Sequence, residues 1–346
     1  MSSGNGTPGA PLELEGAAAL EGGARRGGVV GGRKRRVLKF GGTSVGTAGA
    51  LRCALEIAET ASRERPVVIV VSALAGVTNA LEAALAGAAA SRLDIAGFAA
   101  AIRDRHLALL AALALGKPAL QAASAVRERV AELEGRLRAV AADGAFSPAT
   151  RASVLALGER LSVPVVEAAL RTRGLEALAV DAASLVRTDE SFAEAAVDYP
   201  ATRRLARTAL GSLGKGAVPV VTGFLGATEA GETTLLGRGG SDLTAAVLGW
   251  ALDAERVEIW SDVDGVMTAD PRLVPTAETL PRLSYAEATE LAGGGAKVLH
   301  PRTLEPLEGA GIPVFVGNTL RPGGPGTWIG PAEATIEEAE EAGTAA

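Results

Sequence analysis

Short, uninterrupted apolar runs alternate along this chain with longer stretches of helical periodicity. The runs Val67–Val71 and Ala217–Thr222 lack polar alternation, which is typical of strands buried on both faces. Further strands are expected at Arg36–Phe40, Glu176–Val180, Arg256–Trp260, Ile312–Val316 and near Trp328. Helices are expected at Ala48–Arg63, at Ser147–Arg173, from Ala201, from Ser241, near 284–292 and near 302–310.

This alternation predicts an α/β fold, in which a mostly parallel central sheet lies between helical layers as a three-layer sandwich. Residues 80–143 have helical periodicity with a break near Gly116-Lys-Pro118, so they should form two to four helices packed as a hairpin. His106 falls in this stretch, and we expect a helix-surface or interface histidine rather than a catalytic one. Glu229-Ala-Gly231 indicates a hairpin-like turn.

The two ends of the chain differ from its middle in composition. Residues 1–34 are rich in Gly, Ala and Glu without a sustained period, and residues 331–346 form a short acidic tail. We expect both ends to be disordered and residues 35–330 to form a single α/β domain. The basic cluster Arg33-Lys-Arg-Arg36 should be a solvated lead-in to the first strand.

Charge and composition exclude several classes of function. Among 346 residues, 34 Lys and Arg oppose 40 Asp and Glu, a net charge of −6 that argues against a nucleic-acid partner. The single cysteine, Cys53, rules out an internal disulfide, fits a reducing compartment and is expected to be a small buried residue, so we expect a cytoplasmic protein. The sequence contains no run of about 18 apolar residues, so no membrane-spanning helix is expected. One cysteine and two histidines argue against a His/Cys zinc site, whereas a substrate-bridged Mg²⁺ stays open.

A glycine-rich stretch at 233–244 has the features of an anion site. Gly237, Gly239 and Gly240 leave the backbone uncovered just before a helix whose first residues are Ser241 and Asp242. Bare N–H groups at the positive end of a helix favour an anion, and Arg238 adds a guanidinium. The stretch does not fit the Walker pattern, and a plain turn capped by Ser241 explains the same residues equally well.

Three other strand-end loops carry polar groups, and ligands in such folds bind at the carboxyl ends of strands. We therefore expect the loops 40–46, 72–79, 222–240 and 260–272 to gather at one edge of the sheet. Lys39 stands beside two glycines, and hydroxyls flank the second loop. Glu159 follows a glycine that should let a ligand approach, and Lys297 adds a second lysine.

Seven short motifs in a fixed order carry a resemblance. They are Lys-Phe-Gly-Gly-Thr-Ser (39–44), Val-Ser-Ala-x-x-Gly-Val-Thr-Asn (71–79), Gly-Glu-Arg-Leu-Ser (158–162), Leu-Gly-Arg-Gly-Gly-Ser-Asp (236–242), Asp-Val-Asp-Gly-Val (262–266), Ala-Asp-Pro-Arg (269–272) and Gly-Ala-Lys-Val-Leu-His-Pro (295–301). Over residues 36–330 the chain resembles the catalytic domain of aspartate kinases, in the amino-acid kinase superfamily. The resemblance implies a substrate lobe at about 35–222 and a nucleotide lobe at about 223–330.

The resemblance also implies an activity. Aspartate kinases use ATP and Mg²⁺ to phosphorylate the β-carboxylate of L-aspartate, the first step towards lysine, threonine and methionine. The implied catalytic residues are Lys39 at the transferring phosphoryl group, Asp242 orienting that lysine, and Lys297 neutralising the ATP phosphates. The implied aspartate pocket consists of Ser72, Thr78, Glu159 at the amino group, Arg238 at a carboxylate, and Ser241. The implied nucleotide site consists of Lys39, the backbone of Gly41 and Gly42, Ser261, Asp262, Met267, Arg272 and Lys297, with no metal ligand from the protein.

Two departures from the family pattern qualify this picture. Met267 stands where the family commonly has Tyr, so it could replace the packing of that ring but not its hydroxyl. Aspartate kinases usually continue into two regulatory ACT domains; here we expect a catalytic domain alone, without built-in feedback inhibition. A homodimer or a separate regulatory subunit stays open. The alternatives are a kinase of glutamate, acetylglutamate or UMP, and a non-catalytic regulatory homologue.

Overall fold

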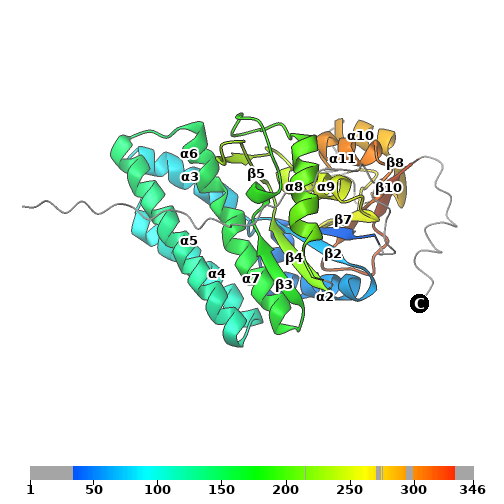
Figure 1. Ribbon diagram of the computed structural model, residues 1–346, viewed down its shortest axis with the longest axis horizontal. Helices are drawn as coiled ribbons and strands as arrows, with labels where there is room; N and C mark the ends of the chain where they lie inside the picture. Colours follow the sequence, from blue (N-terminus) through cyan, green and yellow to red (C-terminus); the bar gives the residue numbers. More distant parts are fainter. Residues whose placement is uncertain (1–33, 215, 270–273, 275, 294–298, 332–346) are drawn as a thin grey trace, which may run out of the picture. The chain divides into compact units, whose positions relative to one another are not determined.

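The fold is that of a computed structural model, which describes residues 34–331 except 215, 270–273, 275 and 294–298. Within these residues an eight-stranded sheet has the order β3-β4-β2-β1-β7-β9-β10-β8 (Figure 1). Its strands are β1 (Arg36–Phe40), β2 (Val67–Val71), β3 (Glu176–Val180), β4 (Ala217–Thr222), β7 (Arg256–Ser261), β8 (Arg282–Ser284), β9 (Val314–Asn318) and β10 (Thr327–Gly330). A two-stranded hairpin, β5 (Leu225–Ala227) with β6 (Thr233–Leu235), confirms the turn expected between them.

The sheet is mostly parallel, as predicted. Strand β1 lies between β2 and β7 and runs parallel to both, and β4 continues the parallel set beyond β2. Within this eight-stranded sheet, only β10 against β9 is antiparallel among the described strand pairs. The carboxyl ends of β1, β2, β4 and β7 therefore meet at one edge, where the polar loops follow. The three-residue strand β8 has no apolar run and was missed by the sequence pattern.

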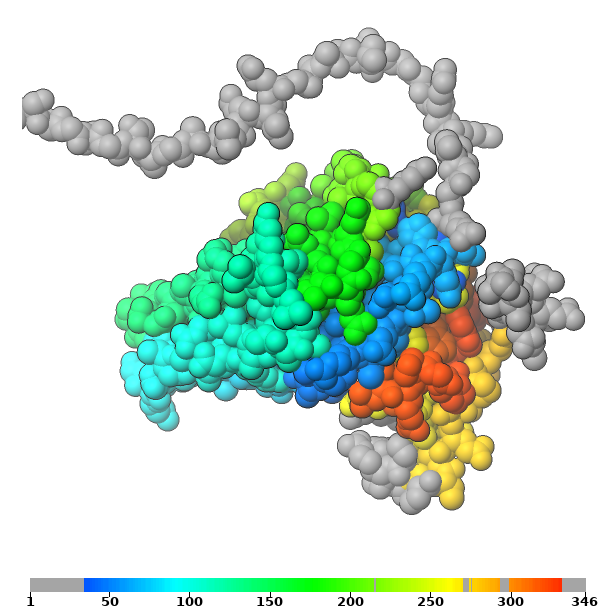
Figure 2. All heavy atoms as spheres, turned by 90° about the horizontal axis from the view of Figure 1, so that it is seen from below, coloured from blue at the N-terminus to red at the C-terminus, as the bar shows by residue number. Residues whose placement is uncertain are grey.

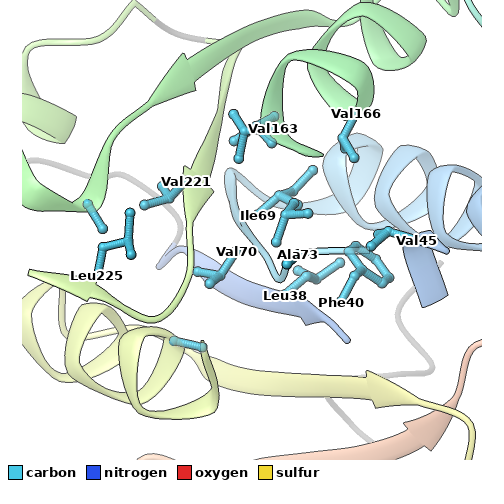
Figure 3. Close-up of a cluster of buried hydrophobic side chains, with 14 of the residues drawn as sticks. Leu38, Phe40, Val45, Ile69, Val70, Ala73, Val163, Val166, Val221 and Leu225 are labelled. Atoms are coloured by element: carbon cyan, nitrogen blue, oxygen red, sulfur yellow. The ribbon is translucent and has the colours of Figure 1, made fainter. Parts of the chain in front are cut away.

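Helices cover both faces of the sheet (Figure 1). They are α1 (Gly42–Val45), α2 (Ala48–Glu64), α3 (Val77–Ala89), α4 (Ile95–Leu113), α5 (Gly116–Asp143), α6 (Pro148–Leu155), α7 (Leu157–Thr172), α8 (Tyr199–Gly211), α9 (Gly240–Ala251), α10 (Tyr285–Gly293) and α11 (Pro301–Glu308). Phe40 and Ile69 face α2 and α7, and Figure 3 shows them beside Val166 of α7. Because side chains alternate along a strand, Lys39 points to the opposite face, where α9 packs on β1.

The long helical region confirms the prediction of two to four helices. Helices α3, α4 and α5 form it, and the expected break lies at Gly116, whose φ of +63° suits glycine. Helices α4 and α5 pack together and α5 packs on α7. In Figure 2 the blue surface over α2 lies between this cyan-to-green helical region and an orange region from the C-terminal part of the chain. None of the described helices combines the length and the apolar character that a membrane crossing requires.

Three local predictions were wrong. The single helix expected at Ser147–Arg173 is interrupted at Ala156 and forms α6 and α7. The turn expected at 41–44 is a short helix, α1, because its backbone folds back on the loop after β2. Cys53, expected to be buried, is only partly buried on α2.

Buried ion pairs hold the amino ends of the central strands together. Arg36, expected to be solvated, is only 4% exposed, because its guanidinium bonds to Glu64 at 2.7 Å and to Glu255 at 3.0 Å. Glu255 also accepts from Arg65 at 2.9 Å. These contacts join the starts of β1 and β7 to the end of α2. Removing one partner of such a cluster would leave a buried charge uncompensated.

The buried His106 is expected to lower the stability of the protein at acid pH. It is fully buried on α4, its Nδ1 lies 2.7 Å from the Ile102 carbonyl, and its buried Nε2 has no hydrogen-bond partner. Burial lowers the pKa of His106 to about 4, from an ordinary 6.5. Between these values the unfolded chain binds the proton and the folded chain does not, so the histidine costs stability as pH falls below 6.5. Denaturant titrations should show that His106→Leu weakens the loss of stability between pH 6.5 and 4; an unchanged pH dependence would contradict this.

Candidate active site

The strand-end loops meet around a cavity of about 320 Å³ at the carboxyl edge of the sheet. Seven residues predicted from the sequence line it: Lys39, Gly42, Ser72, Thr78, Glu159, Ser241 and Asp242. The other lining residues are Ala73, Leu74, Ala75, Gly76, Asn79, Phe224, Gly237, Gly239 and Gly240. The predicted residues Arg272 and Lys297 lie outside the described part of the chain. Gly41, Arg238, Ser261, Asp262 and Met267 are described but do not line the cavity.

A lysine and an aspartate form an ion pair in the cavity wall. Lys39 on β1 points towards α9, and its Nζ lies 2.6 Å from Oδ1 of Asp242 in the first turn of that helix. Both side chains are largely shielded from water, with 9% and 20% exposed. The contact holds the Nζ of Lys39 at the cavity wall. The orienting role that the resemblance implies for Asp242 stays a prediction.

The glycine-rich turn starts α9 without a side-chain cap. Gly237 (φ +80°) and Gly239 (φ +69°) adopt left-handed backbone conformations that favour glycine. Gly239, not Ser241, occupies the N-cap position, and Ser241 lies buried in the first turn; the prediction of a Ser241 cap was wrong. The amino end of this twelve-residue helix borders the cavity, so its dipole favours an anion there.

Glu159 is the buried acid of the site. The residue is 3% exposed in the first turn of α7, and its Oε1 accepts a hydrogen bond of 3.0 Å from the Ala73 N–H. Within the part of the chain that the structure describes, its buried Oε2 has no hydrogen-bond partner. Burial raises the pKa of Glu159 to about 8, an effect that outweighs the Ala73 N–H and the charges of Arg160 and Lys39. A bound cation would satisfy the free oxygen and favour the ionised form.

Two glycines allow the loop after β2 to approach closely. A Cβ on Gly158 would lie 2.8 Å from the Cβ of Ala73, and one on Gly42 would lie 2.7 Å from the Ala73 carbonyl oxygen. Gly158 was predicted to let a ligand approach; the structure shows that it admits the loop instead. Its smallness brings Glu159 within reach of the Ala73 N–H.

The predicted phosphate glycines differ in their surroundings. The Gly41 N–H donates to the Trp260 carbonyl at 3.0 Å, whereas Gly42 lines the cavity. Gly42 is therefore the member of the pair that faces the cavity, and the phosphate roles expected for both glycines stay predictions. Arg238 is exposed at the rim between two lining glycines, and its role also stays a prediction.

The loop after β7 approaches the cavity from the side of α1. Trp260, whose carbonyl accepts from Gly41, precedes Ser261 and Asp262 directly. Met267 lies farther along and forms an isolated bridge with Thr279. The nucleotide roles predicted for Ser261, Asp262 and Met267 stay predictions.

Sequence reasoning missed two contributors to the cavity wall. Ala73 acts through its backbone N–H, which no residue type reveals. Phe224 lines the cavity with a φ of +71°, a strained conformation for a bulky residue, and its N–H donates to Thr244 Oγ1 at 2.9 Å. A Cβ on Gly240 would lie 2.5 Å from the ring of Phe224, so only a glycine at position 240 leaves room for the ring. An aromatic residue directly after a strand and a glycine gives no sequence signal for this conformation.

The sequence of this chain matches a known protein family. The description "Amino acid kinase family" matches residues 34–318. The chain belongs to this family. Lysine-sensitive aspartokinase 3 of Escherichia coli, an aspartokinase, is 38% identical over 300 residues, which cover 85% of this chain and 63% of the relative. Aspartokinase 1, chloroplastic, of Arabidopsis thaliana is 36% identical over 305 residues, which cover 85% of this chain and 51% of the relative.

A solved structure agrees with this family assignment. Aspartokinase III of E. coli in complex with aspartate and ADP matches with a TM-score of 0.78 and 36% identity, over 86% of this chain and 65% of that chain. The present chain thus spans less than two thirds of the length of these relatives. The family match, over residues 34–318, includes all seven motifs and every residue that lines the cavity.

Proposed function

We propose that this amino acid kinase transfers the γ-phosphoryl group of ATP to the β-carboxylate of L-aspartate, giving 4-phospho-L-aspartate and ADP. The observation that carries the proposal is the pairing of opposite charges in one cavity: the Lys39–Asp242 ion pair on one wall and the unsatisfied Glu159 carboxyl on another. Aspartate has two carboxylates and one ammonium, so its site needs cations and one buried anion. The 36% identical aspartokinase III, solved with aspartate and ADP, supports the choice of substrates.

Each end of the substrate has a complementary group. Glu159 receives the ammonium at its free Oε2, and the hydroxyls of Ser72, Thr78 and Ser241 bond to the carboxylates. Arg238, at the rim of the cavity, forms an ion pair with one carboxylate of aspartate. The amino end of α9 adds a favourable field for negative charge. An acceptor without an ammonium group would leave Glu159 unsatisfied, and this selects for an amino acid.

The transfer itself needs position and charge rather than a base. A β-carboxylate oxygen of aspartate attacks the γ-phosphorus, and the bond from that phosphorus to the β,γ-bridging oxygen breaks as ADP leaves. The carboxylate is already a nucleophile, so no proton has to be removed. Lys39, held by Asp242, lies beside the phosphoryl group and offsets the charge that spreads over its oxygens. Lys297 is proposed to offset charge on the ATP phosphates from the other side.

Magnesium enters this proposal with the nucleotide. Within the described residues, no group of three or more His, Cys, Asp or Glu side chains is placed to hold a metal ion. This fits a Mg²⁺ that is bound mainly by the phosphates of ATP, as small, strongly hydrated Mg²⁺ often is. We propose MgATP as the second substrate, the cytoplasm as the site of action, and a role in the synthesis of aspartate-derived amino acids.

An acceptor panel tests the proposal. The purified chain with MgATP should release ADP with L-aspartate and much more slowly with N-acetylglutamate or UMP, which lack the ammonium that Glu159 receives. L-Glutamate, which keeps the ammonium, tests the selection for the shorter side chain. Hydroxylamine trapping of the acyl phosphate identifies the product. ADP release with another acceptor alone would overturn the choice of aspartate. Nucleotide binding without turnover on any acceptor would instead favour a non-catalytic homologue.

A further inference from the structure

A buried pair of hydroxyl groups connects α1, which follows β1, with the end of β9. The Oγ of Ser44 on α1 lies 2.7 Å from Oγ1 of Thr319, and both residues are almost fully buried. Ser44 also donates to the Trp260 carbonyl at 3.2 Å. Because Ser44 uses its only hydrogen there, Thr319 must donate the bond between the two hydroxyls. The result is a directed chain from Thr319 through Ser44 to Trp260.

Thr319 is joined to the same loop a second time through its backbone. Its N–H donates to the Ser261 carbonyl at 2.8 Å, next to the carbonyl that Ser44 holds. The Gly41 N–H also donates to Trp260, at 3.0 Å. Three bonds from α1 and from the end of β9 therefore converge on the two carbonyls of 260–261. These three hydrogen bonds fix the start of the β7 loop relative to Lys39 and Gly42.

Neighbouring residues extend this fixation along the loop. Asn318 donates to Asp264 at 2.7 Å, and Arg321 forms a further ion pair with the same carboxylate. Asp264 is therefore held by protein groups, and before it the Oγ of Ser261 accepts from the Val263 N–H at 3.4 Å. Thr319 and Arg321 lie beyond residue 318, where the match to the family ends.

We infer that Ser44 and Thr319 are positioning residues for the nucleotide: their hydroxyl pair sets the distance between the phosphate side of the cavity (Lys39, Gly42) and the loop 261–262. The inference rests on the proposed function, in which that loop binds ATP. Among the described residues, none of the hydrogen bonds of Ser44 and Thr319 involves a residue of the proposed aspartate pocket. Its loss should therefore weaken the binding of nucleotide and leave that of aspartate unchanged.

The chain offers a matched control on the opposite side. Ser162 on α7 is also fully buried, and its Oγ donates to the Ser72 carbonyl at 2.8 Å. Ser72 and the adjacent Ala73 belong to the proposed aspartate pocket. Ser162→Ala thus removes one buried hydroxyl of the same kind from the substrate side, and it should raise the KM for aspartate rather than that for ATP.

The experiment compares Thr319→Val, which keeps the side-chain shape, with Thr319→Ser, Ser44→Ala and the Ser162→Ala control. Loss of one buried hydrogen bond predicts that Thr319→Val raises the KM for ATP and the Kd for MgADP about fivefold, with the KM for aspartate unchanged. Thr319→Ser should restore the wild-type values. Thr319→Val and Ser44→Ala should together cost less than the sum of their separate effects, because both break the same chain.

Two results would overturn the inference while the proposed function stands. One is an active wild type whose KM for ATP is unaffected by Thr319→Val; the other is an equal rise in both KM values, which would indicate general loosening. Melting temperatures of all variants show whether folding is retained. A wild-type chain that neither binds MgADP in calorimetry nor turns over would overturn the proposed function itself, and this inference with it.

Discussion

Replacing Lys39 with alanine is expected to abolish turnover while leaving the fold intact. The ammonium lies 2.6 Å from Asp242 and faces the cavity, so its removal takes away the fixed positive charge beside the transferring phosphoryl group. Removal of a comparable electrostatic donor lowers kcat by about 10²–10³, and Lys39→Ala also leaves the Asp242 charge facing the phosphates, which adds repulsion. Steady-state ADP release measures the effect.

Two variants control the Lys39 experiment. Lys117→Ala removes an exposed lysine on α5, outside the cavity lining, and should keep wild-type kinetics. Asp242→Asn keeps the ammonium but loses the carboxylate that holds it, so it should lower kcat less than Lys39→Ala does. Near-normal turnover by a folded Lys39→Ala variant would exclude the catalytic role. A collapse of the melting temperature would show that the lysine is needed for folding.

Glu159→Gln is expected to raise the KM for aspartate by about 10²-fold and, at the same time, to stabilise the free protein at alkaline pH. Losing a buried partner of a charged ligand costs about 2–5 kcal/mol of binding, which sets the first effect. The second follows from burial, which raises the pKa of Glu159 to about 8. Glutamine keeps the shape and can accept from Ala73 without carrying a charge.

The direction of the pH effect follows from proton binding. The ordinary pKa of a glutamate is 4.5, so between pH 4.5 and 8 the folded protein holds the proton while the unfolded chain has released it. Wild-type stability should therefore fall as pH rises through this window, by on the order of a few kcal/mol. The curve of Glu159→Gln should lack this fall. Binding of an ammonium favours the ionised acid, so the affinity of the wild type for aspartate should rise from pH 6 to 8.

Denaturant titrations and aspartate kinetics across this pH range test both effects. Glu134→Gln on α5 is the matched control, because Glu134 is paired with Arg138 and lies outside the cavity lining. It should change neither the KM for aspartate nor the slope between pH 6 and 8. Equal pH dependence in wild type and Glu159→Gln would mean that Glu159 is ionised throughout, which would contradict the argument.

The strands of this fold were predictable because they are buried on both faces. Runs such as Val67–Val71 have to be continuous and apolar, so their bounds agree with β2 residue for residue. Seven predicted site residues meet at one cavity because parallel strands bring their carboxyl ends together. What decides the site beyond that is backbone geometry. The Ala73 N–H on Glu159 and the strained φ of Phe224 depend on distances between distant segments.

Helix ends and short elements were predicted less well, for reasons of the same kind. Ser241 has the residue type of a cap, but the left-handed Gly239 occupies that position and turns the serine inward. Helical periodicity continues through Ala156, so the pattern could not show the break between α6 and α7. The Ser44–Thr319 contact joins residues 275 positions apart in the chain, and a pair of small hydroxyl residues carries no periodic signal.

The amino and carboxyl ends of the central strands differ in how their charged groups are paired. At the amino ends of the strands, Arg36 is paired with both Glu64 and Glu255. At the carboxyl ends, the buried Oε2 of Glu159 has no hydrogen-bond partner among the described residues. If Glu159 binds the substrate as proposed, the groups that set stability and those that set substrate affinity lie about one strand length apart. Natural variation could adjust the melting point at one edge of β1 without disturbing the chemistry at the other.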